Sequence, residues 1–228
     1  MKRLDPLKRL PVLIFLMLVI SLGISGYALF QFAITKYSRG DYFYLATREL
    51  EFEFPKSWWA STYEFSNESG NVYYIAAYPL ATREQWVSVL FIIYDEKFTE
   101  AYMERYGLDN VSHALLFEVE RTYSDIKKEN EGATLNVTGR GIITFSRIEA
   151  SYITMKVRDG YVDKDGNVHN LTATFIAWIR GTSQGEKIYY IVFYGVEEEW
   201  SQPQVQKAFE HMLNTVEISE GKENDESH

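Results

Sequence analysis

The stretch LEFEFPKSWWASTYEF, Leu50 to Phe65, sets the fold that we expect for this chain. Leu50, Phe52 and Phe54 alternate with acidic residues, which is the period of a β-strand with one face in the core and the other in water. Pro55 cannot donate a hydrogen bond to a strand ladder, so the strand ends there and the chain turns. We therefore expect a sheet that begins near residue 50 and an aromatic-rich corner directly after it.

Two later segments are apolar almost without alternation. WVSVLFIIYD begins at Trp86, and KIYYIVFYGV covers residues 187–196. Continuous apolar strands are typical of the centre of a sheet that is covered on both faces. Segments that favour further strands are Val72–Tyr78, Thr134–Thr138, Ile142–Phe145, Glu149–Val157 and Leu171–Ile179.

Three helices are indicated. The first covers Phe98 to Tyr106 and ends at Gly107. The second begins after Asp109 as the N-cap, with an apolar stripe at helical spacing and Glu118 and Glu120 on its polar side. The third has the capping-box pattern of Ser201 and Gln204, with Pro203 in the first turn. The apolar stripe of the second helix consists of Val111, Leu115, Val119, Thr122 and Ile126.

Runs of strands and runs of helices are segregated along the chain instead of alternating. This order favours an α+β domain with an antiparallel sheet. Two strands buried on both faces need helices on both sides. The sequence therefore predicts a three-layer α/β/α sandwich around a central antiparallel sheet, over residues 46–219.

The N-terminus predicts a membrane anchor. Residues 10–35 contain no charged side chain, and a helix of this length spans roughly 38 Å, more than the ~30 Å hydrocarbon core of a bilayer. Four basic residues within 1–9 precede the segment and favour a cytoplasmic N-terminus, with residues 36–45 as a juxtamembrane linker. A cleaved secretory peptide, cut near Gly26-Tyr27-Ala28, is the alternative. Both interpretations place the domain outside the cytoplasm, and the acidic residues 220–228 form an expected disordered tail.

Charge and composition exclude several classes of function. The chain is 46% hydrophobic and 16% aromatic, has a net charge of −9 and lacks cysteine. Without residues 1–9 the net charge falls to −12, which repels a phosphate backbone, so no nucleic-acid partner is expected. The absence of cysteine excludes a disulfide framework, a thiolate metal site and a catalytic thiol.

Four N-x-S/T sequons suggest a glycosylated exterior. Together with the anchor and the absence of cysteine, they lead to the hypothesis of an archaeal cell surface. The candidate glycosylation sites are Asn67, Asn110, Asn136 and Asn170.

Several segments resemble the PsbP-like family, whose members share an α/β/α sandwich around an antiparallel sheet. LEFEFPKSWW is similar to the opening strand, proline and tryptophan of that family, and IEASYITMKV resembles a later strand. KIYYIVFYGVEEEW followed by VQKAFEHMLNTVEI looks like its closing strand, helix and last strand. The resemblance covers roughly residues 45–219. It implies a non-catalytic binding or assembly protein, because the family members are mainly of that kind.

One segment resembles a metal site. In DKDGNVHN, Asp163, Asp165 and Asn167 have the spacing of the start of an EF-hand loop, and His169 lies close to them. An EF-hand needs glycine at position six and a carboxylate at position twelve, whereas Gly166 is at position four. We therefore favour a hairpin turn, expect no cofactor, and keep weak Ca²⁺ binding as the alternative.

No catalytic motif is found, so an enzyme is not expected. The histidines form no zinc motif, and no nucleophile elbow or phosphate loop is present. Of the tryptophans, Trp58 and Trp59 are neighbours in an extended segment, so they cannot both point into one core. Whichever of the two stays outside is the first candidate binding residue.

The function expected from the sequence is a membrane-anchored, extracytoplasmic binding or assembly module. Its partners would be the bilayer, through residues 10–35, and a protein of unknown identity. The alternative is a carrier that holds a small ligand or lipid in an aromatic pocket. An extracytoplasmic hydrolase would need a catalytic site for which the sequence offers no candidate.

Overall fold

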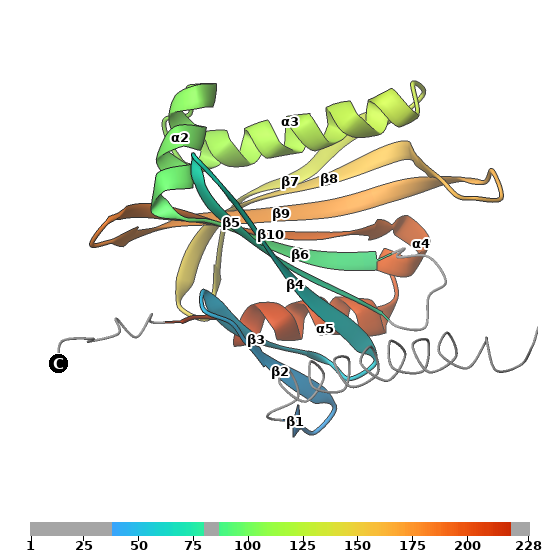
Figure 1. Cartoon of the computed structure of the whole chain (residues 1–228). Helices are drawn as coiled ribbons and strands as arrows, with labels where there is room; N and C mark the ends of the chain where they lie inside the picture. Colours follow the sequence, from blue (N-terminus) through green and yellow to red (C-terminus); the bar gives the residue numbers. More distant parts are fainter. Residues whose placement is uncertain (1–37, 80–86, 220–228) are drawn as a thin grey trace, which may run out of the picture.

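The computed structural model describes residues 38–79 and 87–219, which fold into two antiparallel sheets and four helices (Figure 1). The large sheet has seven strands in the order β4-β5-β6-β10-β9-β8-β7, and the small sheet has four in the order β1-β2-β3-β11. The large sheet consists of β4 (Trp58–Asn67), β5 (Gly70–Pro79), β6 (Val87–Tyr94), β7 (Thr134–Phe145), β8 (Ile148–Val162), β9 (Val168–Thr182) and β10 (Gly185–Val196). The small sheet consists of β1 (Ser38–Arg39), β2 (Tyr42–Ala46), β3 (Leu50–Pro55) and β11 (Glu217–Ile218).

The two continuous apolar segments form the middle of the large sheet, as predicted. β10 pairs with β6 on one side and with β9 on the other, all antiparallel. Both faces of β10 are covered, since Tyr189 and Tyr190 point to opposite faces and each is 2% exposed. This confirms the prediction of a central strand that lies between two apolar layers.

The layers on the two faces of the large sheet differ. Helices α2 (Glu96–Tyr106) and α3 (Val111–Glu129) cover one face, at the top of Figure 1. The other face is covered by helix α5 (Pro203–Thr215) together with the small sheet. The α+β class and the antiparallel sheet are therefore confirmed, but one outer layer is part sheet, whereas helices alone were expected.

The opening stretch belongs to both sheets. In β3, Leu50, Phe52 and Phe54 are buried and the residues between them are half-buried, which confirms the alternation. After Pro55 and a short turn the chain continues as β4, an edge strand of the large sheet. The expected corner is thus brief, and the aromatic residues that follow it lie on a second strand.

Caps fix the ends of the helices. The Asp95 side chain accepts from Phe98 N at the start of α2, and Gly107, with φ of 62°, ends that helix as predicted. For α3 the N-cap is Asn110, one residue after the expected Asp109. The predicted capping box is wrong: Ser201 donates to the Glu197 carbonyl, at the end of the short helix α4 (Glu197–Trp200), instead of capping α5.

The folded region begins earlier than the expected boundary at residue 46. β2 lies largely within the segment expected to be a linker, and Leu45 is buried in the core. No helix in the described part of the chain is long and apolar enough to cross a membrane. The expected span, residues 10–35, and the acidic tail, residues 220–228, lie outside the described residues.

Candidate functional site

A cavity of about 380 Å³ lies between helix α3 and the large sheet, and we call it the α3 pocket. Its floor comes from β6, β8, β9 and β10, and one wall comes from α3. The pocket forms because α3 packs mainly over β8 and β9, which leaves part of β6 and β10 beside it uncovered. Its apolar lining includes Leu90, Ile92, Ile126, Met155, Phe175 and Val192.

A buried carboxylate lies at one end of the α3 pocket. Glu118, on α3, is 5% exposed. Its Oε1 accepts a hydrogen bond of 2.6 Å from the hydroxyl of Tyr102 on α2. Its Oε2 accepts from Nε and Nη2 of Arg121, at 3.0 and 2.5 Å. We call Tyr102, Glu118 and Arg121 the Glu118 cluster; it pairs the buried charge, as a carboxylate in an apolar wall requires.

Electrostatics keep the tyrosines around this carboxylate protonated. Burial, with the added effect of the Glu118 charge, raises the pKa of Tyr94 far above its ordinary value. Burial likewise raises the pKa of Tyr102, which is then fixed as the donor to Glu118. Burial lowers the pKa of Arg121, but the charge and the hydrogen bond of Glu118, together with Tyr94 and Tyr102, raise it, so the net shift is upward.

Tyr190 contributes a polar group without a partner. Its ring lines the α3 pocket and is 2% exposed, and its hydroxyl has no hydrogen-bond partner among the described residues. The nearby hydroxyl of Tyr102 lowers the pKa of Tyr190, but the two hydroxyl groups are not placed so that they form a hydrogen bond. Burial raises the pKa of Tyr190, so this group is a neutral donor. The hydroxyl itself is fully buried, so the polar end of the pocket is formed by Glu118 and Arg121.

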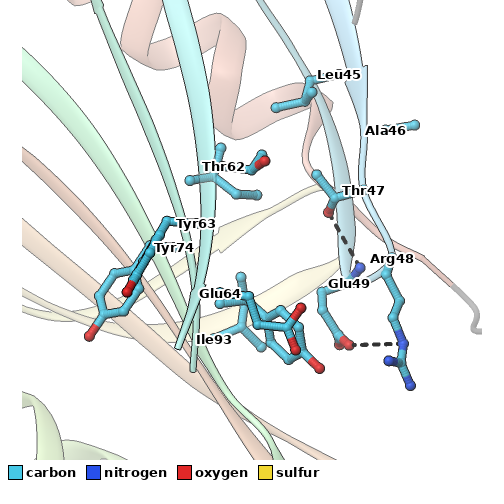
Figure 2. Close-up of a pocket in the computed structure, with 12 residues that line it drawn as sticks. Leu45, Ala46, Thr47, Arg48, Glu49, Thr62, Tyr63, Glu64, Tyr74 and Ile93 are labelled. Atoms are coloured by element: carbon cyan, nitrogen blue, oxygen red, sulfur yellow. Dashed lines mark hydrogen bonds and ion pairs between the residues drawn. The ribbon is translucent and has the colours of Figure 1, made fainter. Parts of the chain in front are cut away.

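A second cavity, of about 360 Å³, lies on the other side of the β4–β5 ribbon (Figure 2). It is bounded by the loop from Ala46 to Glu49 and by both strands. Figure 2 shows Glu64 pointing toward that loop, whereas the rings of Tyr63 and Tyr74 lie together on the opposite face, with centroids 6.3 Å apart. On the loop side of this cavity, Glu49 already contacts Lys187 of β10, and this contact joins the two sheets.

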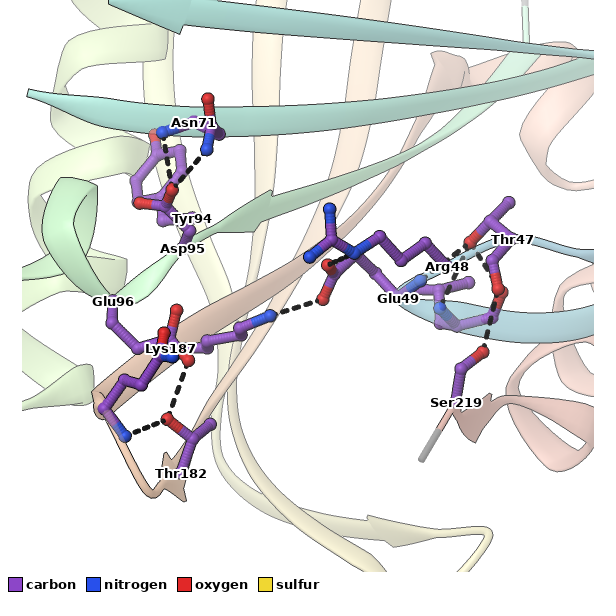
Figure 3. Close-up of polar contacts among 12 residues, drawn as sticks. Thr47, Arg48, Glu49, Asn71, Tyr94, Asp95, Glu96, Thr182, Lys187 and Ser219 are labelled. Atoms are coloured by element: carbon purple, nitrogen blue, oxygen red, sulfur yellow. Dashed lines mark hydrogen bonds and ion pairs between the residues drawn. The ribbon is translucent and has the colours of Figure 1, made fainter. Parts of the chain in front are cut away.

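Figure 3 shows this contact and a separate polar cluster around Asp95, within the large sheet. Glu49 is 5% exposed, and its Oε2 accepts from Lys187 Nζ on β10 at 2.7 Å. Asp95 accepts from both the backbone and the side-chain nitrogen of Asn71, each at 2.8 Å. A Cβ on Gly70, which has φ of 126°, would lie 2.4 Å from Asp95 Oδ1, so this turn requires glycine. We assign this network to architecture.

The two candidate tryptophans point to opposite faces of β4. Trp58 is 6% exposed and packs edge-on against Phe209 of α5, with ring centroids 5.9 Å apart. Trp59 is half-buried and faces Tyr78 across the ladder. Trp58 is therefore a core residue, and Trp59 is the one outside the core. Neither lines the α3 pocket.

The segment with EF-hand-like spacing forms the turn between β8 and β9. Gly166 N donates to the carbonyl of Asp163, and Gly166 has φ of 85°. The Asp163 carboxylate accepts from the backbone N–H groups of Asp165 and Asn167 at 2.9 and 2.8 Å. It also contacts Asn167 Nδ2 at 2.9 Å and His169 Nε2 at 3.2 Å. This is the hairpin turn that the sequence favoured.

These contacts bear on the alternative of a Ca²⁺ site. The side chain of Asn167 and the ring of His169 do meet at Asp163, whereas Asp165 joins through its backbone. Within residues 38–79 and 87–219, no three His, Cys, Asp or Glu side chains are arranged to hold a metal ion. A cation would compete with the hydrogen bonds already on Asp163. Ca²⁺ binding stays a prediction, and a calcium titration followed by melting temperature tests it.

The four candidate glycosylation sites differ in accessibility. Asn67 and Asn136 are exposed, in the β4–β5 turn and on the edge strand β7. Asn110 is exposed and uses its Oδ1 to cap α3. Asn170 is half-buried, with Oδ1 accepting from Asp159 N at 3.1 Å and Nδ2 donating to Glu197 at 3.3 Å. Its amide is thus already committed to internal contacts.

Glu118 was expected on the polar side of α3, but its side chain is buried beneath that helix. Glu118 follows Leu115 by three residues and precedes Thr122 by four, so it lies within the apolar stripe. A charged residue inside an apolar stripe was the available signal. Tyr190, in an almost continuous apolar strand, gave no comparable signal, because its free hydroxyl depends on the packing of α2.

Comparison with known proteins gives a likeness of fold. No family model matches the sequence, and no curated protein matches it. The solution structure of cyanobacterial PsbP (CyanoP) from Synechocystis is 13% identical, with a TM-score of 0.44, over 80% of this chain and 95% of that one. The crystal structure of LpqN, involved in cell envelope biogenesis of Mycobacterium tuberculosis, is 9% identical, with a TM-score of 0.38, over 75% and 83%.

One of these two similar structures is thus a PsbP protein, of the family that the sequence resembles. Both identities are too low, and both TM-scores too small, to carry any inference about function.

Proposed function

We propose that this chain is a non-catalytic binding module that holds an apolar or amphiphilic small ligand in the α3 pocket. The observation that carries the proposal is the cavity itself, apolar along its length and polar at one end. Its volume falls within the ~300–1,000 Å³ typical of small-molecule sites, which combine an apolar lining with a few placed polar groups. This is the carrier function that the sequence analysis kept as the alternative.

The apolar N-terminal segment suggests where such a ligand would be met. Residues 10–35, preceded by basic residues, are expected to anchor the chain with the domain on the extracytoplasmic side of a membrane. A module held at a bilayer is surrounded by amphiphiles with long hydrocarbon chains. A ligand of that class matches both the lining of the α3 pocket and its polar end.

Photo-crosslinking in membranes tests the proposal with the full chain in place. The probe is a long-chain acylglycerol with a diazirine in its chain and an alkyne for enrichment. After irradiation and digestion, tandem mass spectrometry locates the labelled residues. We expect labels on the segments that line the α3 pocket, on α3 and on β6 or β10.

A pair of variants on α3 serves as matched test and control. Thr122 lines the α3 pocket, whereas Ser124 is exposed on the same helix and is not part of the lining. Thr122→Trp should fill the mouth and remove the labels from the pocket, and Ser124→Trp should leave them unchanged. Labelling confined to residues outside the pocket, or equal loss in both variants, would overturn the proposal.

Protein binding along β4 is the second candidate, and one observation favours it. β4 is an edge strand whose outer half is exposed, with Tyr63 65% and Phe65 43% exposed. Trp59 lies on the same face of this strand as Tyr63 and Phe65. An exposed aromatic edge strand is suited to pairing with an added strand from a partner. Loss of a defined crosslinked complex in Tyr63→Ser, together with no labelling of the α3 pocket by the lipid probe in the unmodified chain, would support this candidate over the carrier.

A further inference from the structure

We propose that a second binding site lies at the β9–β10 hairpin, where Arg180 holds the carboxylate or phosphate group of a small polar molecule. The site is a cavity of about 300 Å³ between this hairpin and the loop at Arg48 and Glu49, and we call it the Arg180 pocket. Arg180 shares a face of β9 with Trp178, which belongs to the core on the side of α5 and the small sheet. The α3 pocket lies on the other face, so this inference is independent of the proposed function.

The first argument is a pair of like charges. Arg180 on β9 lies directly opposite Lys187 on β10 in the antiparallel ladder. Like charges in this position destabilise a sheet unless negative charge compensates them. Lys187 has its compensation, because its Nζ donates to Glu49 Oε2 at 2.7 Å. Arg180 is half-buried and makes no hydrogen bond or ion pair with residues 38–79 or 87–219, so it is the cation that an added anion would match.

The second argument is that the carboxylates of the Arg180 pocket are already engaged. Figure 3 shows Lys187 reaching from β10 toward Glu49, whose Oε1 also lies 3.8 Å from Arg48 Nε. Glu96 Oε1 accepts from the Thr182 hydroxyl at 2.7 Å.

The cations at this site outweigh the burial of the acids. Burial alone would raise the pKa of Glu96, but hydrogen bonds from Thr182 and the backbone, with the charges of Lys187 and Arg48, lower it. Three cations and two carboxylates line the pocket, which leaves one positive charge in a chain whose net charge is −9. An anionic group is therefore the complementary ligand.

The rest of the lining indicates what carries the anionic group. None of the described residues that line the Arg180 pocket has an aliphatic side chain, and hydroxyl and amide groups come from Thr182, Ser183, Gln184 and Ser219. The volume is at the lower end of the ~300–1,000 Å³ of small-molecule sites. The guanidinium of arginine matches the geometry of carboxylate and phosphate oxygens. These features together fit a small, polar, anionic molecule.

The carboxylate could also come from the same chain. Ser219 lines the Arg180 pocket and its hydroxyl donates to the Thr47 carbonyl, so the chain leaves the described region at the rim of the pocket. Residues 220–228 follow and contain four acidic residues and one lysine. A tethered group acts at a high effective concentration, so these carboxylates would compete with a free anion. The test below separates the two sources.

Thermal unfolding of the full chain in detergent tests the inference, with sodium phosphate or sodium succinate added at constant pH and ionic strength. At about 50 mM anion we expect the melting temperature to rise by about 3–8 °C, as for a site with a dissociation constant of about 1 mM. Phosphate also stabilises proteins in general, because it is excluded from their surface. The comparison between variants therefore decides.

Arg180→Gln should lose most of this rise. Arg158→Gln is the matched control and should keep it, because Arg158 is exposed on β8, outside the pocket lining, and its loss removes the same charge. A response to phosphate alone or to succinate alone that depends on Arg180 would support the site and identify the preferred group.

The same measurements are repeated in a chain whose acidic residues after Ser219 are replaced by glutamine, at Glu220, Glu223, Asp225 and Glu226. If the anion is a free molecule, the rise that depends on Arg180 appears in both chains. If residues 220–228 supply the carboxylate, it appears only in the neutralised chain. Equal responses of Arg180→Gln and Arg158→Gln to both anions in both chains would overturn the inference and leave the proposed function untouched.

Discussion

The hydroxyl of Tyr102 lies 2.6 Å from Oε1 of Glu118, and this contact joins helix α2 to helix α3 above the large sheet. It is a charge-assisted hydrogen bond between two buried side chains, a class that is short and strong. The same carboxylate receives Arg121, which is half in solvent. One residue thus fixes the wall of the α3 pocket and positions both helices against the sheet.

Glu118→Ala should destabilise the protein by about 2–4 kcal/mol. The substitution leaves the buried Tyr102 hydroxyl without its acceptor and leaves Arg121 beside an apolar wall. Urea unfolding at neutral pH measures the loss. Glu120→Ala is the control, since Glu120 is exposed on the same helix and should change stability by less than about 0.5 kcal/mol. Similar effects from both substitutions would contradict the role of the Glu118 cluster.

Tyr190→Phe should leave the ligand-free protein equally stable or make it more stable by up to about 1 kcal/mol. The substitution removes a buried hydroxyl that has no partner and keeps the ring in its packing. Melting temperature of the delipidated protein, compared with the unmodified chain, checks this. A clear loss of stability would mean that the hydroxyl has an internal partner, for which Tyr102 is the nearest candidate.

The core strands could be predicted from the sequence because buried strand positions carry apolar residues in a regular pattern. β6 and β10 read as central strands from their continuous apolar residues, and β3 as half-buried from its alternation. β2 was not found, because the tyrosines and phenylalanine near residue 43 fit a membrane interface as well as a strand. Its assignment depends on pairing with β3, a contact between segments that carry no mutual signal in one sequence.

The α3 pocket could not be derived from the sequence. Its volume depends on how far α3 sits from β6 and β10, and this offset is set by packing of whole elements. The capping box at Ser201 failed for a related reason. Ser201 is taken up by the end of α4, a helix of four residues too short to leave a periodic pattern.

Trp58→Ala should cost about 3–5 kcal/mol and Trp59→Ala about 1 kcal/mol. Trp58 fills the layer between β4 and α5, where its loss leaves a cavity against Phe209, whereas Trp59 is half-buried on the other face. Denaturant midpoints of the two variants give the comparison. Equal losses would show that both rings are structural and would remove Trp59 as a binding candidate.

Glycan occupancy should be high where the asparagine amide is exposed and low where it is hydrogen-bonded within the protein. Asn67 and Asn136 are exposed, so their side-chain nitrogens can be modified in the folded chain. At Asn170 a glycan would have to break the contact of Nδ2 with Glu197. Glycopeptide mass spectrometry of the native protein should find the lowest occupancy at Asn170. If all four sites are unmodified, the sequons no longer support a glycosylated exterior.

Asp163→Asn should destabilise the protein at neutral pH, and the difference from the unmodified chain should shrink in acid. Hydrogen bonds from Asn167, from the backbone and from His169 hold the pKa of Asp163 far below its ordinary value, against a smaller opposing effect of burial. In the unfolded chain the pKa returns to about 3.9, so between the two values the unfolded state binds more protons than the native state. The stabilisation is therefore complete above about pH 4 and is lost as the pH falls toward the native pKa.

Urea midpoints at neutral pH and at steps below about pH 4 measure this difference. Asp165→Asn is the control, because Asp165 is exposed in the same turn and joins it through its backbone N–H. Its effect at neutral pH should be the smaller of the two. An Asp163→Asn difference that stays constant from neutral pH down to the acid limit of folding would contradict the depressed pKa. The β8–β9 turn would then owe its shape to Gly166 and the backbone bonds alone.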